Sequence, residues 1–186
     1  MTAKLVNHIA DLPGRPAVVT IDGYSGAGKT ILGESLARIL PSRVTLLLEV
    51  ELWAHGWSDL AGAVERVAAV VDGLRDGPVT TTTWNWWTEQ EEEPIVLEPA
   101  PIILVVGCGA GQIEADLSVW IDAPEDVRLA RVKARDPYDW SEHWEEWKEQ
   151  ELALLDRFDA QSNADYVLDA EDIAALIEAG GTPLDT

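Results

Sequence analysis

The sequence is poor in cysteine and in long apolar runs. Cysteine occurs once, as Cys108, so neither an intrachain disulfide nor a cysteine-rich zinc site can form. The apolar runs, such as Ile102–Val106, are short, and none approaches the ~20 residues that a membrane-spanning helix needs. The segment Met1–Asp11 lacks the apolar core of a secretion signal. These absences lead us to expect a cytoplasmic protein in a reducing compartment.

Basic residues are also scarce. Thirteen lysines and arginines stand against 34 aspartates and glutamates, which gives a formal net charge of −21. A surface of this charge repels phosphate backbones and anionic lipids, so we expect neither nucleic acids nor membranes as partners. Free nucleotide is repelled too, so any nucleotide site must concentrate its few positive groups locally. The acidity itself indicates high solubility or a salty host, with a specific basic partner as the alternative.

Short apolar segments alternate with helical patterns along most of the chain. We expect strands over residues 17–22, 43–49, 102–106, 117–122 and 165–168. We expect helices from the Gly-rich loop to Pro41, and over residues 59–75 with Ser58 as the cap, 124–135, 141–158 and 171–179. Residues 78–100 look irregular, with a short edge strand at 95–98. This alternation predicts a parallel sheet covered on both faces, with ligands beyond the carboxyl ends of its strands.

Residues 23–30 carry the most specific pattern in the chain. They match G-x-x-x-x-G-K-[ST] without deviation and read Gly23-Tyr24-Ser25-Gly26-Ala27-Gly28-Lys29-Thr30. The glycines let the backbone approach phosphate, and successive N–H groups then form an anion nest at the N-terminus of the next helix. Lys29 adds a point charge for the outer phosphates, and Thr30 a hydroxyl for Mg²⁺. The segment predicts a site for ATP or a similar nucleoside triphosphate.

This loop, with Ile21-Asp22 ahead of it, resembles the uridine kinase-like branch of the P-loop small-molecule kinases. Residues 122–136 look like that family's helix leading into its lid, and 164–168 like its final strand. The likeness covers about residues 17–170. It implies a single domain over residues 1–186, a three-layer α/β/α fold with a mostly parallel five-stranded sheet, and a small helical lid at about 135–145. It also implies ATP and Mg²⁺ as cofactors.

Three arginines follow the fourth expected strand. Arg128, Arg131 and Arg135 are spaced i, i+3, i+7 and so share one helical face. Arginines placed in this way commonly stabilise charge on a transferring phosphoryl group. The resemblance implies that Arg131 and Arg135 reach the ATP phosphates when the lid closes. The alternative is a solvated helix face paired with Glu125 and Asp126.

The acceptor side departs from the family pattern. A kinase for a hydroxyl substrate needs a carboxylate near the end of its second strand, and here Glu51 is the better counterpart, with Glu49 as the alternate. Glu51 would also help Thr30 to hold Mg²⁺. Both glutamates could instead be exposed carboxylates at a strand end. The family has an acid where this chain has Val106, and another where it has Asn85, so either the substrate differs or the chemistry is weakened or absent.

Nine tryptophans are many for a chain of 186 residues. Two loops expected to border the acceptor pocket contribute candidate substrate contacts: Trp53, His55, Trp57, Trp84, Asn85 and Trp86. Aromatic walls suit a flat or sugar-like ligand, although such residues could equally pack irregular loops onto the domain. A further stripe, Trp140, Trp144 and Trp147, has the spacing of a core-facing helix side.

The favoured function is transfer of the γ-phosphoryl group of ATP to a small hydroxyl-bearing acceptor, for instance a nucleoside. A non-catalytic nucleotide-binding regulator derived from such a kinase is the alternative. A GTPase or motor ATPase is disfavoured because the chain lacks suitably placed switch and base-reading motifs. The acceptor, the preference for ATP or GTP, and the choice between monomer and homodimer stay open at this level.

Overall fold

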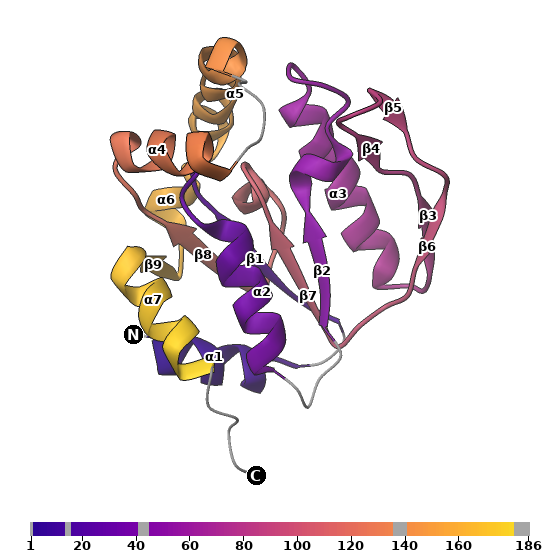
Figure 1. Cartoon of the computed structure of the whole chain (residues 1–186). Coiled ribbons are helices and arrows are strands. Elements are labelled where there is room, and N and C mark those ends of the chain that lie inside the picture. Colours follow the sequence, from indigo (N-terminus) through magenta and orange to yellow (C-terminus); the bar gives the residue numbers. More distant parts are fainter. Residues whose placement is uncertain (1, 14–15, 41–44, 136–140, 181–186) are drawn as a thin grey trace.

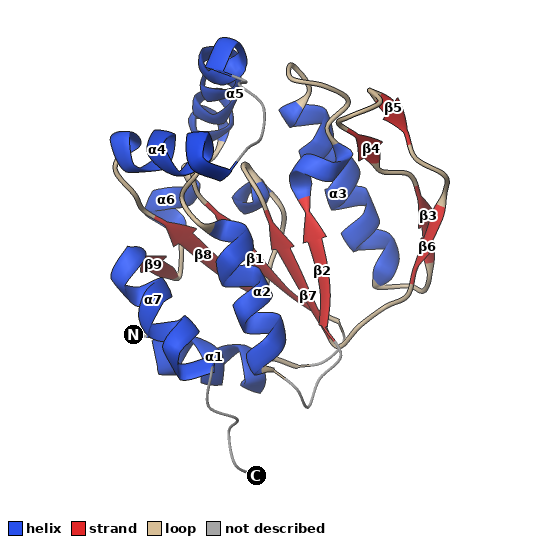
Figure 2. Ribbon diagram, in the orientation of Figure 1, coloured by secondary structure: helices blue, strands red, loops and turns tan. Residues whose placement is uncertain are grey.

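Five parallel strands form the centre of the molecule, in the spatial order β2-β7-β1-β8-β9 (Figure 2). This computed structural model describes residues 2–13, 16–40, 45–135 and 141–180. The strands are β1 (Ala17–Asp22), β2 (Thr45–Glu49), β7 (Ile102–Val106), β8 (Leu117–Ile121) and β9 (Tyr166–Leu168). The chain leaves β1 toward β2 and β7 on one side and returns to β8 and β9 on the other. Ligands of such sheets bind at this switch point, beyond the carboxyl end of β1.

Helices cover both faces of the sheet (Figure 1). One face packs against α3 (Leu60–Leu74) and α5 (Trp144–Arg157) through residues such as Ile103 and Val105. The other packs against α1 (Thr2–Asp11), α2 (Lys29–Ile39) and α7 (Ala170–Gly180). Alternate residues of the fully apolar strand β7 enter the two cores, as expected for a central parallel strand. The predicted three-layer α/β/α fold with a five-stranded parallel sheet is confirmed.

The region between α3 and β7 differs from its prediction. Instead of one edge strand, it forms two small antiparallel pairs beside the domain, β3 (Val79–Thr81) with β6 (Ile95–Leu97) and β4 (Trp84–Asn85) with β5 (Gln90–Glu91). The short edge strand predicted at 95–98 is present as β6, but it belongs to a small separate sheet with β3 rather than to the main sheet. Ile95 and Val96 are exposed, whereas a strand of the main sheet would bury both of its faces under helices.

Helix α4 (Glu125–Arg135) is close to its predicted position, and the 3-10 turn η3 (Ser141–His143) is the first turn of the helix predicted over 141–158. Helix α6 (Ala160–Asn163) and the 3-10 turns η1 (Val50–Trp53) and η2 (Ala110–Gln112) were not predicted. Helix α1 was not predicted, and α3 is preceded by Asp59 at its N-cap rather than by Ser58. Residues 136–140 of the predicted lid lie outside the described residues, and residues 141–145 form η3 and the start of α5. In the described part of the chain no helix is both long and apolar enough to cross a membrane.

Candidate nucleotide and acceptor site

The loop between β1 and α2 depends on three glycines with positive φ. These angles are 149° at Gly23, 79° at Gly26 and 114° at Gly28. A Cβ on Gly23 would lie 2.6 Å from the carbonyl oxygen of Ile121, and one on Gly26 would lie 2.5 Å from that of Arg128. Glycine is therefore required both for the backbone angles and for the close approach of neighbouring backbone. The loop has the conformation that its sequence pattern predicts.

Helix α2 begins directly behind this loop. Its N-cap, Gly28, makes no side-chain capping bond, so the first N–H groups of the helix keep no side-chain acceptor. Such an N-terminus carries the positive end of the helix dipole and offers backbone donors to an anion. The start of α2 therefore offers backbone N–H groups to an anion, whereas the N–H groups of Gly23 and Ser25 in the loop already donate to Asp22 and Glu151.

Lys29 lies across the loop and is only 7% exposed. Its ammonium donates to the carbonyls of Gly23 (2.9 Å) and Tyr24 (3.2 Å) and to the Cys108 sulfur (3.2 Å). Burial alone would lower the pKa of Lys29, but the carboxylates around it, Glu51 and Glu151 first among these, hold it above its ordinary value. The ammonium is therefore a fixed positive charge at neutral pH.

Asp22, the last residue of β1, ties the loop to the neighbouring β7–β8 connection. Its carboxylate accepts N–H bonds from Gly23 (2.7 Å), Gly109 (2.9 Å) and Gly111 (2.9 Å). Burial raises its pKa to about 6, although the three N–H bonds and Lys29 work to lower it. Sequence reasoning noted Asp22 only as part of a resemblance. The sequence signal that could have identified Asp22 as a site residue is its position as a carboxylate at the end of a mainly apolar strand.

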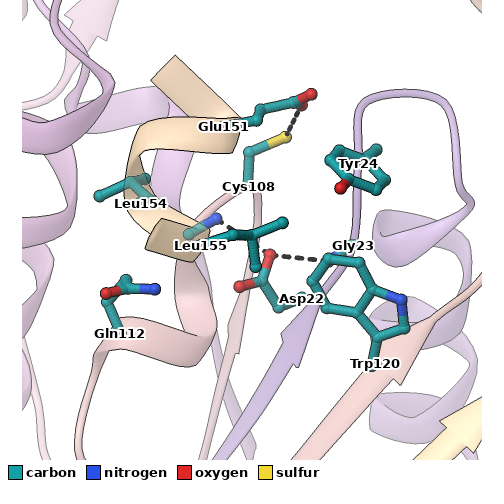
Figure 3. A pocket seen from close by; sticks show the side chains of 10 residues that line it. Asp22, Gly23, Tyr24, Cys108, Gln112, Trp120, Glu151, Leu154 and Leu155 are labelled. Atoms are coloured by element: carbon teal, nitrogen blue, oxygen red, sulfur yellow. Dashed lines mark hydrogen bonds between the residues drawn. The ribbon is translucent and has the colours of Figure 1, made fainter. Parts of the chain in front are cut away.

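A second carboxylate reaches the loop from helix α5. Glu151, 6% exposed, uses one oxygen, Oε1, to accept from Ser25 N (2.8 Å), Ser25 Oγ (2.9 Å) and Cys108 Sγ (3.0 Å). Burial raises the pKa of the Cys108 thiol well above its usual value, so the sulfur keeps the proton that it donates. Figure 3 shows Glu151 above Cys108, with Asp22 below, at a small cavity behind the loop.

Glu151 and Cys108 were not among the predicted site residues. Glu151 lies four residues after Trp147 and seven after Trp144, both buried, so it belongs to the core-facing stripe of α5. The sequence alone shows that a carboxylate on this buried stripe is unusual. It does not show that the partner of this carboxylate is Ser25 on the phosphate loop.

The arginines of α4 brace the outside of the loop. Arg128 is 5% exposed and donates to the carbonyls of Ser25 (3.1 Å) and Ala123 (3.1 Å), while its guanidinium lies 4.8 Å from the Tyr24 ring centre. This burial rules out a solvated position for Arg128.

Arg131 takes the next place along the same helix. It donates to the carbonyls of Gly26 (3.3 Å) and Ala27 (3.0 Å). Arg131 lines the main cavity described below, and Arg128 does not. The side chain of Arg135 lies outside the described residues.

Glu51 lies over the end of β7, a strand that carries no acid of its own. Val106 at the end of β7 is fully buried in the core, facing α2, and supplies no polar group. Glu51 Oε1 instead accepts from Cys108 N at 3.0 Å, and a Cβ on Gly107 would lie 2.6 Å from Glu51 Oε2. Because Gly107 has no side chain, a carboxylate from the end of β2 can lie over the end of β7.

One cavity of about 870 Å³ joins these parts. Its floor is the phosphate loop from Ser25 to Thr30, and Glu49 and Glu51 border it at the end of β2. Helix α7 forms one apolar wall of the cavity through Ala170, Ile173, Ala174 and Ile177. A second wall is aromatic and consists of Trp57, Trp86 and Trp147. Sites for small molecules commonly have this size and this mixture of apolar walls with a few polar groups.

The predicted substrate residues divide into two groups. Trp57 and Trp86 line the cavity, whereas Trp53, His55, Trp84 and Asn85 do not. Trp53 is buried and donates through Nε1 to Thr81 Oγ1 (3.0 Å), and His55 stacks on Trp84. Asn85 accepts from the backbone N–H groups of Trp87 and Thr88 and so shapes a turn. These four residues pack and shape the loops that hold Trp57 and Trp86, and their direct contact with a substrate stays a prediction.

Trp144 and Trp147 are buried as predicted, and Trp147 also borders the cavity. The third member of that stripe, Trp140, lies outside the described residues.

Metal-binding groups are sparse. Within the described ranges, no cluster of three or more His, Cys, Asp or Glu side chains could hold a metal by itself. Thr30, Glu49 and Glu51 nevertheless line the same cavity. A hydroxyl and carboxylates are the ligands that Mg²⁺ takes when phosphate oxygens and water complete its shell, so this donor set fits a metal that arrives with a nucleotide.

No protein-family model matches the chain, and no curated protein matches its sequence. Solved structures do match. A possible uridine kinase from Bacillus stearothermophilus aligns at a TM-score of 0.67 and 18% identity, covering 90% of this chain and 97% of that one. A proposed fructose transport system kinase from Silicibacter sp. aligns at 0.61 and 14%, covering 90% and 98%. At these identities the likeness establishes the fold: this chain has the fold of the P-loop kinases.

Proposed function

We propose that this protein transfers the γ-phosphoryl group of a nucleoside triphosphate, with ATP as the expected donor, to a hydroxyl group of a small molecule. The observation that carries the proposal is the single cavity in which a phosphate loop, two carboxylates and an aromatic wall meet. A protein that only bound nucleotide would need the loop but not an acceptor compartment beside it.

The donor half would hold the triphosphate through the N–H groups of the loop and the charges of Lys29 and Arg131. The apolar wall of α7 is suited to the nucleoside base. Thr30 with Glu51 or Glu49 would hold Mg²⁺, which supplies charge neutralisation on the phosphates when bound. Arg135 follows Arg131 by four residues in the chain. We keep as part of the proposal that Arg135 closes over the nucleotide phosphates.

In the acceptor half, Glu51 would accept the hydroxyl proton, a role supported by its position on the border of the cavity. The acceptor oxygen forms a bond to the γ-phosphorus, the bond from that phosphorus to the bridging oxygen breaks, and the nucleoside diphosphate leaves. Glu51 takes the proton, and the Cys108 N–H bond fixes its carboxylate in place. General-base assistance of this kind contributes about 10²–10⁴-fold in rate.

The experiment is release of ADP in a coupled assay with a panel of nucleosides, sugars, vitamins and amino alcohols. Acceptor-dependent release that Lys29→Ala abolishes supports the proposal, and the exposed Lys133 on α4 provides the matched control, Lys133→Ala. Tight binding of ATP with no turnover of any acceptor would contradict it.

That second outcome is the signature of a non-catalytic nucleotide-binding regulator. One observation favours this alternative, namely that the Glu151 carboxylate is bonded to Ser25 on the phosphate loop while β7 ends without an acid.

A further inference from the structure

We propose that the acceptor is a cationic alcohol, a small molecule with a hydroxyl group and a protonated or quaternary amine, and that Trp57, Trp86 and Trp147 hold its cationic group. This inference rests on the proposed function, because it names the substrate class for the acceptor half of the same cavity. It is argued from the charge and the aromatic geometry of that half.

The positive groups of the cavity are confined to the donor half. Among the described residues that line it, the cations are Lys29 and Arg131, and both are bonded to carbonyls of the phosphate loop. The carboxylates that line the cavity are Glu34 on α2 and, at the acceptor end, Glu49 and Glu51, of which Glu51 lies close enough to Lys29 to raise its pKa. An acceptor bearing a carboxylate or phosphate would therefore meet like charge without a described basic partner, in a molecule of net charge −21.

The three indoles form a corner rather than a stack. Their planes cross at 58° (Trp57–Trp86), 81° (Trp57–Trp147) and 67° (Trp86–Trp147), with ring centres 4.9, 6.0 and 6.2 Å apart. Steeply inclined aromatic faces around one space are the arrangement that recognises ammonium groups through cation–π attraction. A flat base would be better served by parallel faces on both of its sides.

The corner is held in place by hydrogen bonds. Trp86 Nε1 donates to the backbone oxygen of Glu51 at 3.0 Å, which ties the indole to the residue that faces the acceptor hydroxyl. Gln150 of α5 donates to the Trp57 carbonyl (2.7 Å) and accepts from Leu60 N (2.9 Å), which fixes the Trp57 loop against the helix that carries Trp147. A rigid aromatic corner loses little freedom when it binds a ligand.

Further negative charge lies behind Trp57. His143 stacks on that ring at 4.5 Å and 6°, and its nitrogens lie 3.7 Å from Glu142 and 3.8 Å from Glu146. Because Glu142 and Glu146 are 80% and 48% exposed, they add only a screened negative field to that of Glu49 and Glu51.

The binding test uses pairs of nearly equal size that differ in charge: choline and its neutral carbon isostere 3,3-dimethylbutan-1-ol, and glucosamine and glucose. Binding is followed by calorimetry and by tryptophan fluorescence on the full chain, with a nonhydrolysable ATP analogue present. At least one cation should bind about tenfold more tightly than its neutral partner. Equal or tighter binding by the neutral member of every pair would overturn the inference.

The variants locate the cation. Trp86→Leu should remove the preference, and Trp86→Phe should weaken it while keeping a ring. Trp87→Leu should leave it unchanged, because Trp87 is 74% exposed and does not line the cavity. A preference that survives Trp86→Leu in a folded protein would contradict this placement.

The same ligands separate this inference from the proposed function. Cation-selective binding without transfer to any acceptor leaves the aromatic site standing and removes the kinase proposal. Phosphoryl transfer to neutral acceptors alone would support the kinase proposal and remove the inferred cation site.

Discussion

The proposed donor and acceptor halves of the cavity are built in different ways. The proposed donor half centres on a continuous segment of eight residues, the glycine-rich loop with Lys29 and Thr30. The acceptor half is an assembly of side chains from η1, the loop before α3, the β4–β5 region and α5. A local motif thus determines one half, and the packing of four separate segments determines the other. Substitutions should therefore act on the two halves in different ways.

Lys29→Ala should have the largest effect, because it removes the donor half's central charge. We expect phosphoryl transfer to fall by at least about 10²–10³-fold and nucleotide binding to weaken with it. The variant should also be destabilised, since Asp22, Glu51 and Glu151 lose the cation near them. Coupled ADP release, calorimetry with an ATP analogue and denaturant melts measure the three effects. A variant with unchanged nucleotide affinity would contradict this account of the donor half.

Glu51→Gln should slow phosphoryl transfer while leaving the binding of the nucleotide donor nearly unchanged. We expect kcat to fall about 10²-fold or more, with the affinity for nucleotide in the absence of Mg²⁺ nearly unchanged, because the amide keeps an acceptor for Cys108 N but loses the base. Glu49→Gln is the matched control on the same strand end and should cost less. If Glu49→Gln is the more damaging variant, the roles of the two carboxylates are exchanged.

Asp22→Asn tests what holds the donor half in shape. An amide has one acceptor oxygen for three N–H groups, so we expect a loss of about 1–3 kcal/mol in the free energy of unfolding. The loss should depend on pH. Because the folded-state pKa of Asp22 is raised from 3.8 to about 6, the folded protein holds this proton where the unfolded chain has released it.

Stability from this group is accordingly present at low pH and declines as pH rises to about 6. Relative to the variant, the wild-type protein should lose up to about 3 kcal/mol over that window, and the difference should be flat above it. Urea melts of both proteins across the range measure the difference, and a difference that grows with pH would show that the Asp22 pKa is not raised.

Glu151→Gln should have the smallest effect, and in the favourable direction. All three bonds made by Glu151 use Oε1, so an amide oxygen can keep them while the negative charge beside the phosphate loop disappears. We expect nucleotide affinity to rise by about 1 kcal/mol, or about fivefold, from relief of like-charge repulsion. Glu149→Gln, on the exposed side of the same helix, is the control, and calorimetric titration distinguishes them.

Much of the donor half follows from the sequence, because the groups that make it are neighbours in the chain. Gly23, Gly26 and Gly28 permit the loop, β1 precedes it, and α2 starts at Lys29, so strand, bend and helix need only local rules. The order of strands and helices, and hence the parallel sheet, followed from the same kind of local pattern.

Tertiary packing decided the rest. Sequence reasoning could place Trp53, Trp57, Trp84 and Trp86 near the acceptor, but not separate the two that face the cavity from the two that support them. The sequence also could not predict that Glu151 contacts Ser25, which is 126 residues away. Nor could it predict that Glu51 lies over Gly107, next to Val106, which has no acidic group. Those contacts depend on how α5 and η1 pack against the sheet, and side-chain direction across such distances is set by the fit of whole elements rather than by spacing along the chain.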